Sequence, residues 1–93
     1  MYKLVFTDSY TRRAIRFMRK HRNVRPQYEK ALRLLELNPF HPSLRLHKLK
    51  GRLHALHSVS INLTYRITIS FLIQDDTIIP IDIGTHDDIY ERR

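Results

Sequence analysis

The sequence predicts an α+β fold in which a helical hairpin packs on one face of a curled sheet. Apolar residues recur at helical spacing between residues 10 and 35, and they alternate with period two over most of residues 53–83. The expected order is an N-terminal strand, two antiparallel helices and a three-stranded antiparallel meander. A chain of 93 residues can build one core but not two, so residues 1–93 are expected to form a single domain.

The first strand and first helix follow from residue type and spacing. Residues 2–7 are rich in β-branched and aromatic side chains, which favours a strand, and Asp8 or Ser9 can cap the next helix. The apolar stripe of that helix comprises Tyr10, Ala14, Phe17, Met18 and His21. Its other face carries Arg12, Arg13, Arg16, Arg19 and Lys20. Because almost no acidic residue stands three or four positions away, we expect a binding face rather than a merely solvated one.

The second helix is bounded by two prolines. Residues 22–25 form the connection, and Pro26 suits the first turn of a helix. The apolar stripe that follows comprises Tyr28, Ala31, Leu32 and Leu35. Asn38-Pro39 ends it, since proline disfavours helical geometry in the residue before it. So short a connection predicts an antiparallel hairpin.

Residues 40–52 form a basic connector between the helices and the strands. Three leucines, Leu44, Leu46 and Leu49, are expected to pin it to the body, with His47, Lys48 and Lys50 beside them. This alternation of leucine and cations favours a loop that faces a ligand over an idle one.

Three strands are expected to complete the sheet. In the first, Leu53, Ala55, His57, Val59 and Ile61 share one face. After a turn at residues 62–64, the second strand alternates through Tyr65, Ile67, Ile69, Phe71 and Ile73. Asp75-Asp76 turns the chain into the last strand, which is expected to be half-buried, with Ile79, Ile81 and Ile83 on its inward face. Pro80 cannot donate to a ladder, so it is expected at an unpaired edge or a bulge. The second face of the sheet is expected to be too polar for burial under another layer.

The last strand stops at Gly84, where the chain can turn sharply, and chemically active side chains follow it. They are His86 and Tyr90, with Asp87 and Asp88 between them, expected to cap the terminal turn. A rigid strand that delivers His and Tyr to a sheet edge is one interpretation, and an inactive C-terminal tail is the other.

Charge is the strongest global feature of the sequence. The net charge is +8; residues 1–52 carry 14 Lys/Arg and 3 Asp/Glu, whereas residues 53–93 carry 3 and 6. A basic half of this size implies an anionic partner such as nucleic acid, the ribosome or an acidic protein.

Composition also limits the function classes. With no cysteine, disulfides, thiolate zinc sites and a cysteine nucleophile are excluded. No leader-like segment or apolar run of membrane-spanning length is present, so a cytoplasmic protein without membrane contact is expected. His47, His54 and His57 could be metal ligands, but the last two have opposite parity on one predicted strand. We therefore expect no cofactor and no metal.

The remaining polar side chains match metal-free cleavage of RNA through its own 2′-hydroxyl. That chemistry needs a base for the 2′ proton, a cation for the charge that gathers on phosphorus, and an acid for the leaving oxygen. Candidates are Arg66, His47 or His57, His86 and Tyr90, with Lys48 and Lys50 nearby. Structural roles stay open for three of them: Arg66 paired with an acid, His57 half-buried, and Tyr90 an anchor in the core.

Several short motifs together resemble the RelE/ParE superfamily of bacterial toxins, most closely its YafQ- and YoeB-like branches. They are Leu46-His47-Lys48-Leu49-Lys50-Gly51, Ser58-Val59-Ser60-Ile61, Tyr65-Arg66-Ile67 and Ile83-Gly84-Thr85-His86-Asp87-Asp88-Ile89-Tyr90. The resemblance implies a RelE-like fold and the toxin of a type II toxin–antitoxin system. Such toxins are small basic endoribonucleases that cut mRNA in the ribosomal A site and are silenced by a cognate, here acidic, antitoxin in a hetero-oligomer.

The resemblance also implies roles for individual residues. His47 falls at the position of a candidate general base, Arg66 at that of the phosphate-binding arginine, and His86 at that of the group acting on the leaving oxygen or phosphate. Tyr90 matches the aromatic residue that stacks on a base. His57 stands where RelE has a lysine, and it is kept as a fifth catalytic candidate. Lys48, Lys50 and Arg52 are expected to contact the RNA backbone.

The chain lacks the second-strand lysine pair of RelE, having His57 and Val59 instead, which favours an acid–base route of RNA cleavage over an electrostatic one.

Two alternatives to an endoribonuclease remain. The first is a gyrase inhibitor, because ParE members share the fold but inhibit gyrase and lack this catalytic set. The second is a non-catalytic RNA- or ribosome-binding module.

Overall fold

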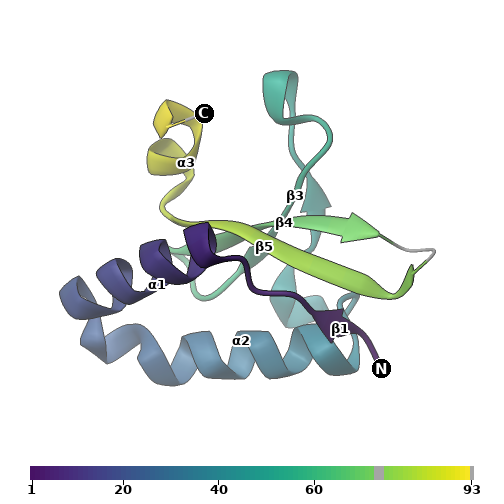
Figure 1. The fold of residues 1–93 in the computed structure, drawn as a ribbon, viewed down its shortest axis with the longest axis horizontal. Coiled ribbons are helices and arrows are strands. Elements are labelled where there is room, and N and C mark those ends of the chain that lie inside the picture. The colour runs from purple at the N-terminus through teal and green to yellow at the C-terminus, as the bar shows by residue number, and fades with distance from the viewer. Residues whose placement is uncertain (73–74, 93) are drawn as a thin grey trace.

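The computed structural model describes residues 1–72 and 75–92 (Figure 1). The elements, with η for a 3-10 turn, are β1 (Lys3–Leu4), α1 (Asp8–Lys20), η1 (Arg22–Val24), α2 (Arg25–Leu37), η2 (Pro42–Leu44), β2 (His47–Lys48), η3 (Gly51–Leu53), β3 (His57–Ser60), β4 (Arg66–Leu72), β5 (Thr77–Gly84) and α3 (His86–Arg92). The predicted α+β class and the order of its elements are confirmed. Ile73, expected in the second strand of the meander, lies outside the described residues. No helix in the described ranges is long and apolar enough to cross a membrane.

The sheet has five described strands in the order β1-β5-β4-β3-β2. Strands β2 to β5 pair antiparallel in succession, and β1 pairs parallel with β5. The meander therefore contains one strand more than the sequence predicted, because His47 and Lys48 pair with Ser58 and His57. The predicted strand start at Leu53 is wrong: the chain forms η3 there, and Gly51 adopts a left-handed φ of 64° that bends it away from the ladder.

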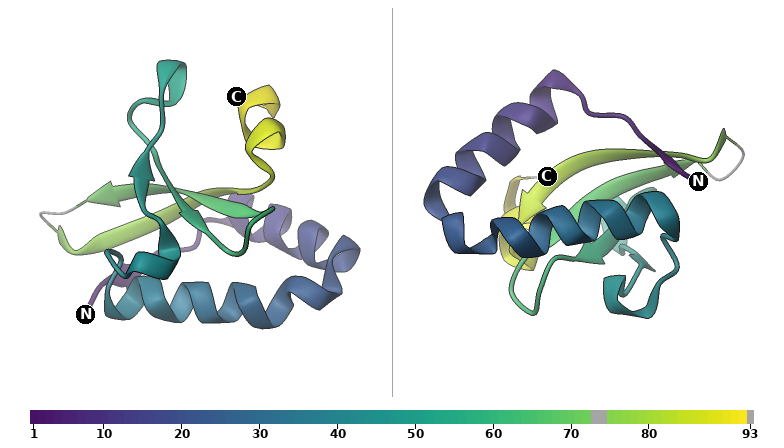
Figure 2. Two further views of the ribbon diagram at one scale, coloured as in Figure 1. Left: turned by 180° about the vertical axis from the view of Figure 1, so that it is seen from behind. Right: turned by 90° about the horizontal axis from the view of Figure 1, so that it is seen from below.

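The two helices form the predicted hairpin and cover one side of the sheet (Figure 2). The N-cap of α1 is Thr7, whose hydroxyl oxygen accepts a hydrogen bond from Tyr10 N at 3.1 Å, so the predicted caps at Asp8 and Ser9 are wrong. Asp8 instead lies in the first helical turn, where its charge suits the helix dipole. Residues buried between the helices and the sheet include Tyr10, Leu35, Val59, Ile67, Ile69 and Ile78.

A register shift changes which residues of β5 face the core. Thr68 pairs with Asp82 but Ile69 pairs with Pro80, which leaves Ile81 as an extra residue in β5. The bulge predicted for Pro80 is confirmed, whereas the edge position is wrong because β5 lies between β1 and β4. Before the bulge the expected inward phase is also wrong, since Ile79 and Ile81 are half-buried while Ile78 and Pro80 are fully buried.

The other side of the sheet carries a small second layer. Figures 1 and 2 show α3 and the segment before β3 standing on the side opposite α2. Leu49, Leu53 and Ile89 form a separate buried cluster there, with Leu56 and Tyr90 packed against it. Ser58 and Thr68, which belong to the polar face, are 1% and 0% exposed. The expectation that this face stays uncovered is therefore wrong at its centre.

Candidate active site

Helix α3 begins with a reciprocal cap that fixes the position of His86. The Thr85 hydroxyl oxygen accepts a hydrogen bond from Asp88 N at 3.1 Å, and the Asp88 carboxylate accepts one from Thr85 N at 3.3 Å. The predicted capping role is thus confirmed for Asp88 but not for Asp87, whose carboxylate lies 3.4 Å from His86 Nδ1. Since a carboxylate can only accept, His86 Nδ1 is the donor in that contact, and Nε2 is the nitrogen left to meet a substrate.

Tyr90 stands one helical turn after His86 and joins α3 to the basic connector. The two rings lie 4.6 Å apart between their centroids. The Tyr90 hydroxyl accepts a hydrogen bond from Lys50 N at 3.2 Å and faces Lys50 O at 3.4 Å. The Arg52 guanidinium donates to the Tyr90 carbonyl oxygen. The structure therefore brings Tyr90, His86, Lys50 and Arg52 together.

His47 lies on the exposed edge strand β2. Its Nδ1 is 2.9 Å from the carbonyl oxygen of Arg45, which can only accept, so the proton sits on Nδ1. Nε2 of the neutral ring then carries the lone pair that a general base needs. His47 pairs with Ser58, which places it on the same face of the sheet as Arg66, because Ser58 and Ser60 alternate with Val59 and Ser60 pairs with Arg66.

His57 is separated from that face. It pairs with Ile69, alternates with Ser58, and its ring lies 6.1 Å from that of Phe71 on the helix side of the sheet. Its Nδ1 is buried without a hydrogen-bond partner in the described structure. Burial lowers the pKa of the His57 imidazole, and the nearby charges of Lys48 and His47 lower this pKa further. The ring is therefore neutral near pH 7.

Arg66 occupies the first position of β4, directly across from Gly84 at the end of β5. The side chain is half-buried, and its Nε has no hydrogen-bond acceptor among the described residues. Across the described ranges, no carboxylate lies within ion-pair distance of it, so the alternative in which Arg66 pairs with an acid has no support there. A partly shielded guanidinium without a counter-ion is suited to a phosphate.

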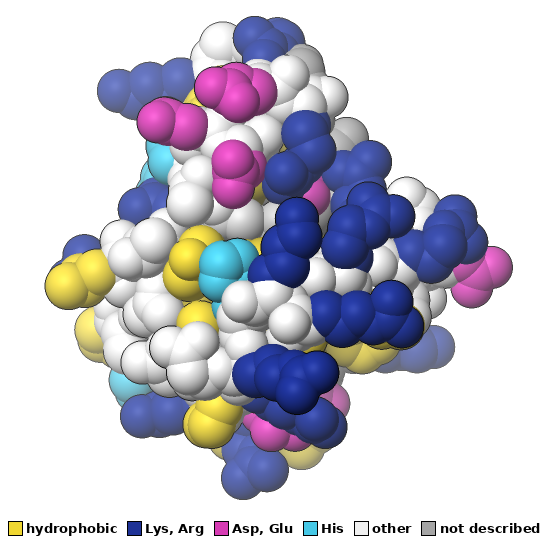
Figure 3. All heavy atoms as spheres, turned by 90° about the vertical axis from the view of Figure 1, so that its left-hand side faces the viewer, with side chains coloured by type: hydrophobic (Ala, Val, Ile, Leu, Met, Phe, Trp, Pro, Cys, Tyr) yellow, Lys and Arg dark blue, Asp and Glu magenta, His cyan; other side chains and the backbone are white. Residues whose placement is uncertain are grey.

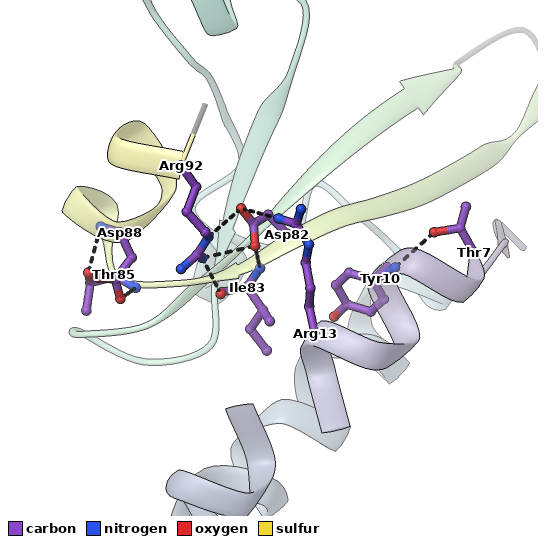
Figure 4. A network of polar contacts seen from close by, with 8 residues as sticks. All are labelled: Thr7, Tyr10, Arg13, Asp82, Ile83, Thr85, Asp88 and Arg92. Carbon is purple, nitrogen blue, oxygen red and sulfur yellow. Dashed lines mark hydrogen bonds and ion pairs between the residues drawn. The ribbon is translucent and has the colours of Figure 1, made fainter. Parts of the chain in front are cut away.

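A buried carboxylate that sequence reasoning missed anchors α3 to the sheet. Asp82 is 0% exposed, and Arg92 of α3 donates to both its oxygens, at 3.2 Å and 3.0 Å (Figure 4). Arg13 of α1 lies 3.2 Å from Asp82 Oδ2. Burial alone raises the pKa of the Asp82 carboxyl, but hydrogen bonds from Arg92 and the Ile83 amide, with the two positive charges, bring that pKa below its ordinary value. An aspartate between isoleucines in a strand was the available signal.

Gly84 lies in the chain between the anchoring Asp82 and the candidate catalytic His86. Gly84→Ala is expected to lower the free energy of unfolding. Its φ is 154°, and an added Cβ would lie 3.0 Å from Arg92 Nη2 and 3.3 Å from Asp88 Cβ. Backbone strain and crowding together should cost about 2–3 kcal/mol, measured by urea denaturation. Gly51→Ala is the control, because its φ is also positive but nothing lies within 4 Å of the new Cβ. A cost at Gly84 no larger than at Gly51 would contradict the crowding argument.

The described residues contain no group of three His, Asp or Glu side chains placed to hold a metal ion. His54 lies in the turn after η3 rather than on the strand with His57, so the predicted parity argument does not apply to it.

No protein-family model matches the chain, and no curated protein matches it in sequence. Among solved structures, YafQ from Escherichia coli strain BL21(DE3) superposes with a TM-score of 0.77 at 11% identity, covering 97% of this chain and 99% of that one. The chain has the fold of the YafQ toxin. A YoeB/ParE toxin from Agrobacterium tumefaciens gives 0.72 at 20% identity, over 90% of this chain and 98% of that one. The E. coli DinJ-YafQ toxin–antitoxin complex gives 0.74 at 13% identity, over 96% and 97%.

Proposed function

We propose that this protein is the toxin of a type II toxin–antitoxin system and a metal-independent endoribonuclease that cuts mRNA in the ribosomal A site, in the cytoplasm. The observation that carries the proposal is Arg66, a guanidinium without a carboxylate partner in the described structure, opposite the strand end that delivers His86 and Tyr90. The toxin fold supports it, because the same fold carries YafQ and YoeB/ParE toxins.

The proposed reaction is attack of a ribose 2′-oxygen on the adjacent phosphorus. His47 Nε2 takes the 2′ proton, Arg66 binds the oxygens that gain charge, and protonated His86 gives a proton from Nε2 to the leaving 5′-oxygen. The products are a 2′,3′-cyclic phosphate and a free 5′-hydroxyl. His57 has no step in this scheme, since it faces the other side of the sheet.

Recognition of the RNA is assigned to the residues around this centre. The half-buried Tyr90 ring, held at its hydroxyl by Lys50, is suited to stack on a base next to the cut. Lys48, Lys50 and Arg52 are exposed along β2 and the following turn, where they can contact backbone phosphates.

A reconstituted translation reaction tests the function. After treatment with EDTA to remove bound metal, the protein should still cut mRNA on programmed ribosomes. The fragments should end in 2′,3′-cyclic phosphate. In cells that express the protein, DNA breaks with intact mRNA would instead indicate a gyrase inhibitor. Salt-sensitive ribosome binding without fragments would indicate a binding module.

The proposed antitoxin partner should dock between the two helices of the hairpin. A groove of about 950 Å³ lies there, with apolar and cationic side chains in its lining: Phe6, Ile15, Met18, Leu32, Arg19, Arg22 and Arg25. Phe6 and Ile15 are each 49% exposed, so the groove offers apolar surface to a partner. An acidic amphipathic segment complements an apolar floor with a basic rim.

We expect the affinity for the antitoxin to fall as salt rises. The basic rim should give a dissociation constant that increases about tenfold or more between roughly 50 mM and 500 mM NaCl, since exposed charges are screened over this range. Isothermal titration calorimetry with the purified antitoxin measures it. A salt-independent dissociation constant would contradict the acidic partner.

A further inference from the structure

A second cationic pocket lies outside the proposed cleavage site. It has a volume of about 380 Å³ and is formed by α1, the end of β5 and α3. Its lining includes Arg13, Arg16, Lys20, Asp82, Gly84 and Arg92. Figure 3 looks onto this end of the molecule, where Lys and Arg side chains gather in a broad band, with acidic side chains at the top of the view and at its right-hand and lower edges.

The carboxylates of this pocket are already engaged within the protein. Four cationic side chains line it against two carboxylates, Asp82 and Asp88. Asp82 is fully buried under Arg13 and Arg92, and Asp88 accepts the backbone hydrogen bond from Thr85. Counting only Lys, Arg, Asp and Glu, the net charge of the lining is +2.

Two of the cations are held in place before any ligand arrives. Arg13 and Arg92 are fixed by the same buried carboxylate, yet their side chains remain 35% and 42% exposed. Arg13 Nη1 is itself buried, 3.2 Å from Asp82 Oδ2 but not aligned for a hydrogen bond, so a ligand would meet the exposed remainder of the Arg13 side chain. Fixed donors bind an anion with a smaller loss of side-chain entropy than mobile ones.

The chemistry of the lining selects the kind of anion. Unlike the apolar groove between α1 and α2, this pocket is predominantly polar, and the large apolar residues of its described lining are Phe17 and Ile83. Guanidinium groups match phosphate oxygens in geometry. Gly84 lines the pocket and also pairs with Arg66, so the pocket adjoins the proposed cleavage site at the end of β5.

We propose that this pocket is a second phosphate-binding subsite, which takes a backbone phosphate of a single RNA strand whose scissile phosphate lies at Arg66. The proposal rests on the proposed function, because that function supplies the RNA. Arg16 and Lys20, both exposed, close around the phosphate, while Arg13 and Arg92 form its fixed floor.

Binding of a 2′-O-methylated single-stranded RNA tests the subsite without cleavage, because this RNA lacks the attacking hydroxyl. By fluorescence anisotropy, Arg16→Gln/Lys20→Gln should weaken binding about tenfold and reduce the slope of log affinity against log salt by about 0.7 for each phosphate that is no longer neutralised. The control Lys30→Gln/Arg33→Gln removes the same charges from exposed positions on α2 and should change binding less than twofold. Inorganic phosphate should shift the NMR amide signals of Ile83 and Gly84 saturably in the wild type only.

Three results would overturn the subsite: equal weakening by both variants, absence of the phosphate-induced shifts, or weakened binding of the antitoxin with RNA binding unchanged. Failure of the proposed endoribonuclease function would give a different result from failure of the subsite. A protein that binds the methylated RNA through this pocket but leaves unmodified mRNA intact retains the subsite and loses the endoribonuclease assignment.

Discussion

Arg66→Ala/His86→Ala is expected to reduce mRNA cleavage by at least about 10³-fold and to relieve growth arrest on expression. A positioned general acid contributes about 10²–10⁴-fold, and a cation aimed at developing charge contributes a comparable factor. The two side chains come from different elements, Arg66 from β4 and His86 from the first turn of α3, and Arg66 pairs with Gly84, two residues before His86. The measurement is the rate of fragment formation on programmed ribosomes under single-turnover conditions.

Two further variants make this result specific. Arg33→Ala/His41→Ala removes the same residue types from exposed positions away from the site and should leave the rate within about twofold. Arg66→Lys should recover only part of the activity, because an ammonium keeps the charge but not the planar fork. Undiminished cleavage by the Arg66/His86 variant, with an unchanged urea midpoint, would refute the assignment.

The periodicity of the sequence predicted the architecture because most of the core is made by local repeats. The stripe through Tyr10 and Ala14 is buried as expected, and so is that of α2 through Ala31 and Leu35. The predictions that were wrong depended on strand pairing between residues far apart in the chain. Because of the bulge at Ile81, the inward residues of β5 before it are Ile78 and Pro80 instead of Ile79 and Ile81, and nothing in an alternating run of isoleucines marks where such a residue is inserted.

The candidate site was predictable in its residue types but not in its geometry. His86 and Tyr90 were expected directly after the last strand, and the structure places them one turn apart in α3, with 4.6 Å between their ring centroids. The two-residue strand β2 was too short to give a periodic signal, so the pairing that sets His47 on the face of Arg66 and His57 on the other face could not be predicted from the sequence.

The anchor at Asp82 explains how so small a chain holds α3 in place. Helix α3 has seven residues, too few to be stable alone in water. It is held by the cluster around Ile89 on one side and by the pair Arg92–Asp82 on the other. The same carboxylate also fixes Arg13 of α1, so one buried charge couples the proposed catalytic helix, the sheet and the basic face.

Asp82→Asn is accordingly expected to lower the free energy of unfolding by about 3–4 kcal/mol at pH 7. Removing one partner of a buried ion pair costs about 3–5 kcal/mol, and the partial exposure of Arg13 and Arg92 places this case in the lower part of that range. Urea denaturation with unchanged m-values measures the difference. Asp76→Asn, the same change at an exposed position, should cost less than about 0.5 kcal/mol.

The pH dependence of that difference identifies its cause. Because the pKa of Asp82 is lowered on folding, its contribution is fully present above the unfolded-state pKa of about 4 and is lost as pH falls through the depressed folded-state pKa. The stability gap between wild type and Asp82→Asn should therefore be constant from pH 7 to about pH 5 and shrink below about pH 4. A packing defect would give a gap that does not depend on pH. A gap that stays constant down to about pH 2 would show that shape, rather than charge, is what Asp82 contributes to the anchor.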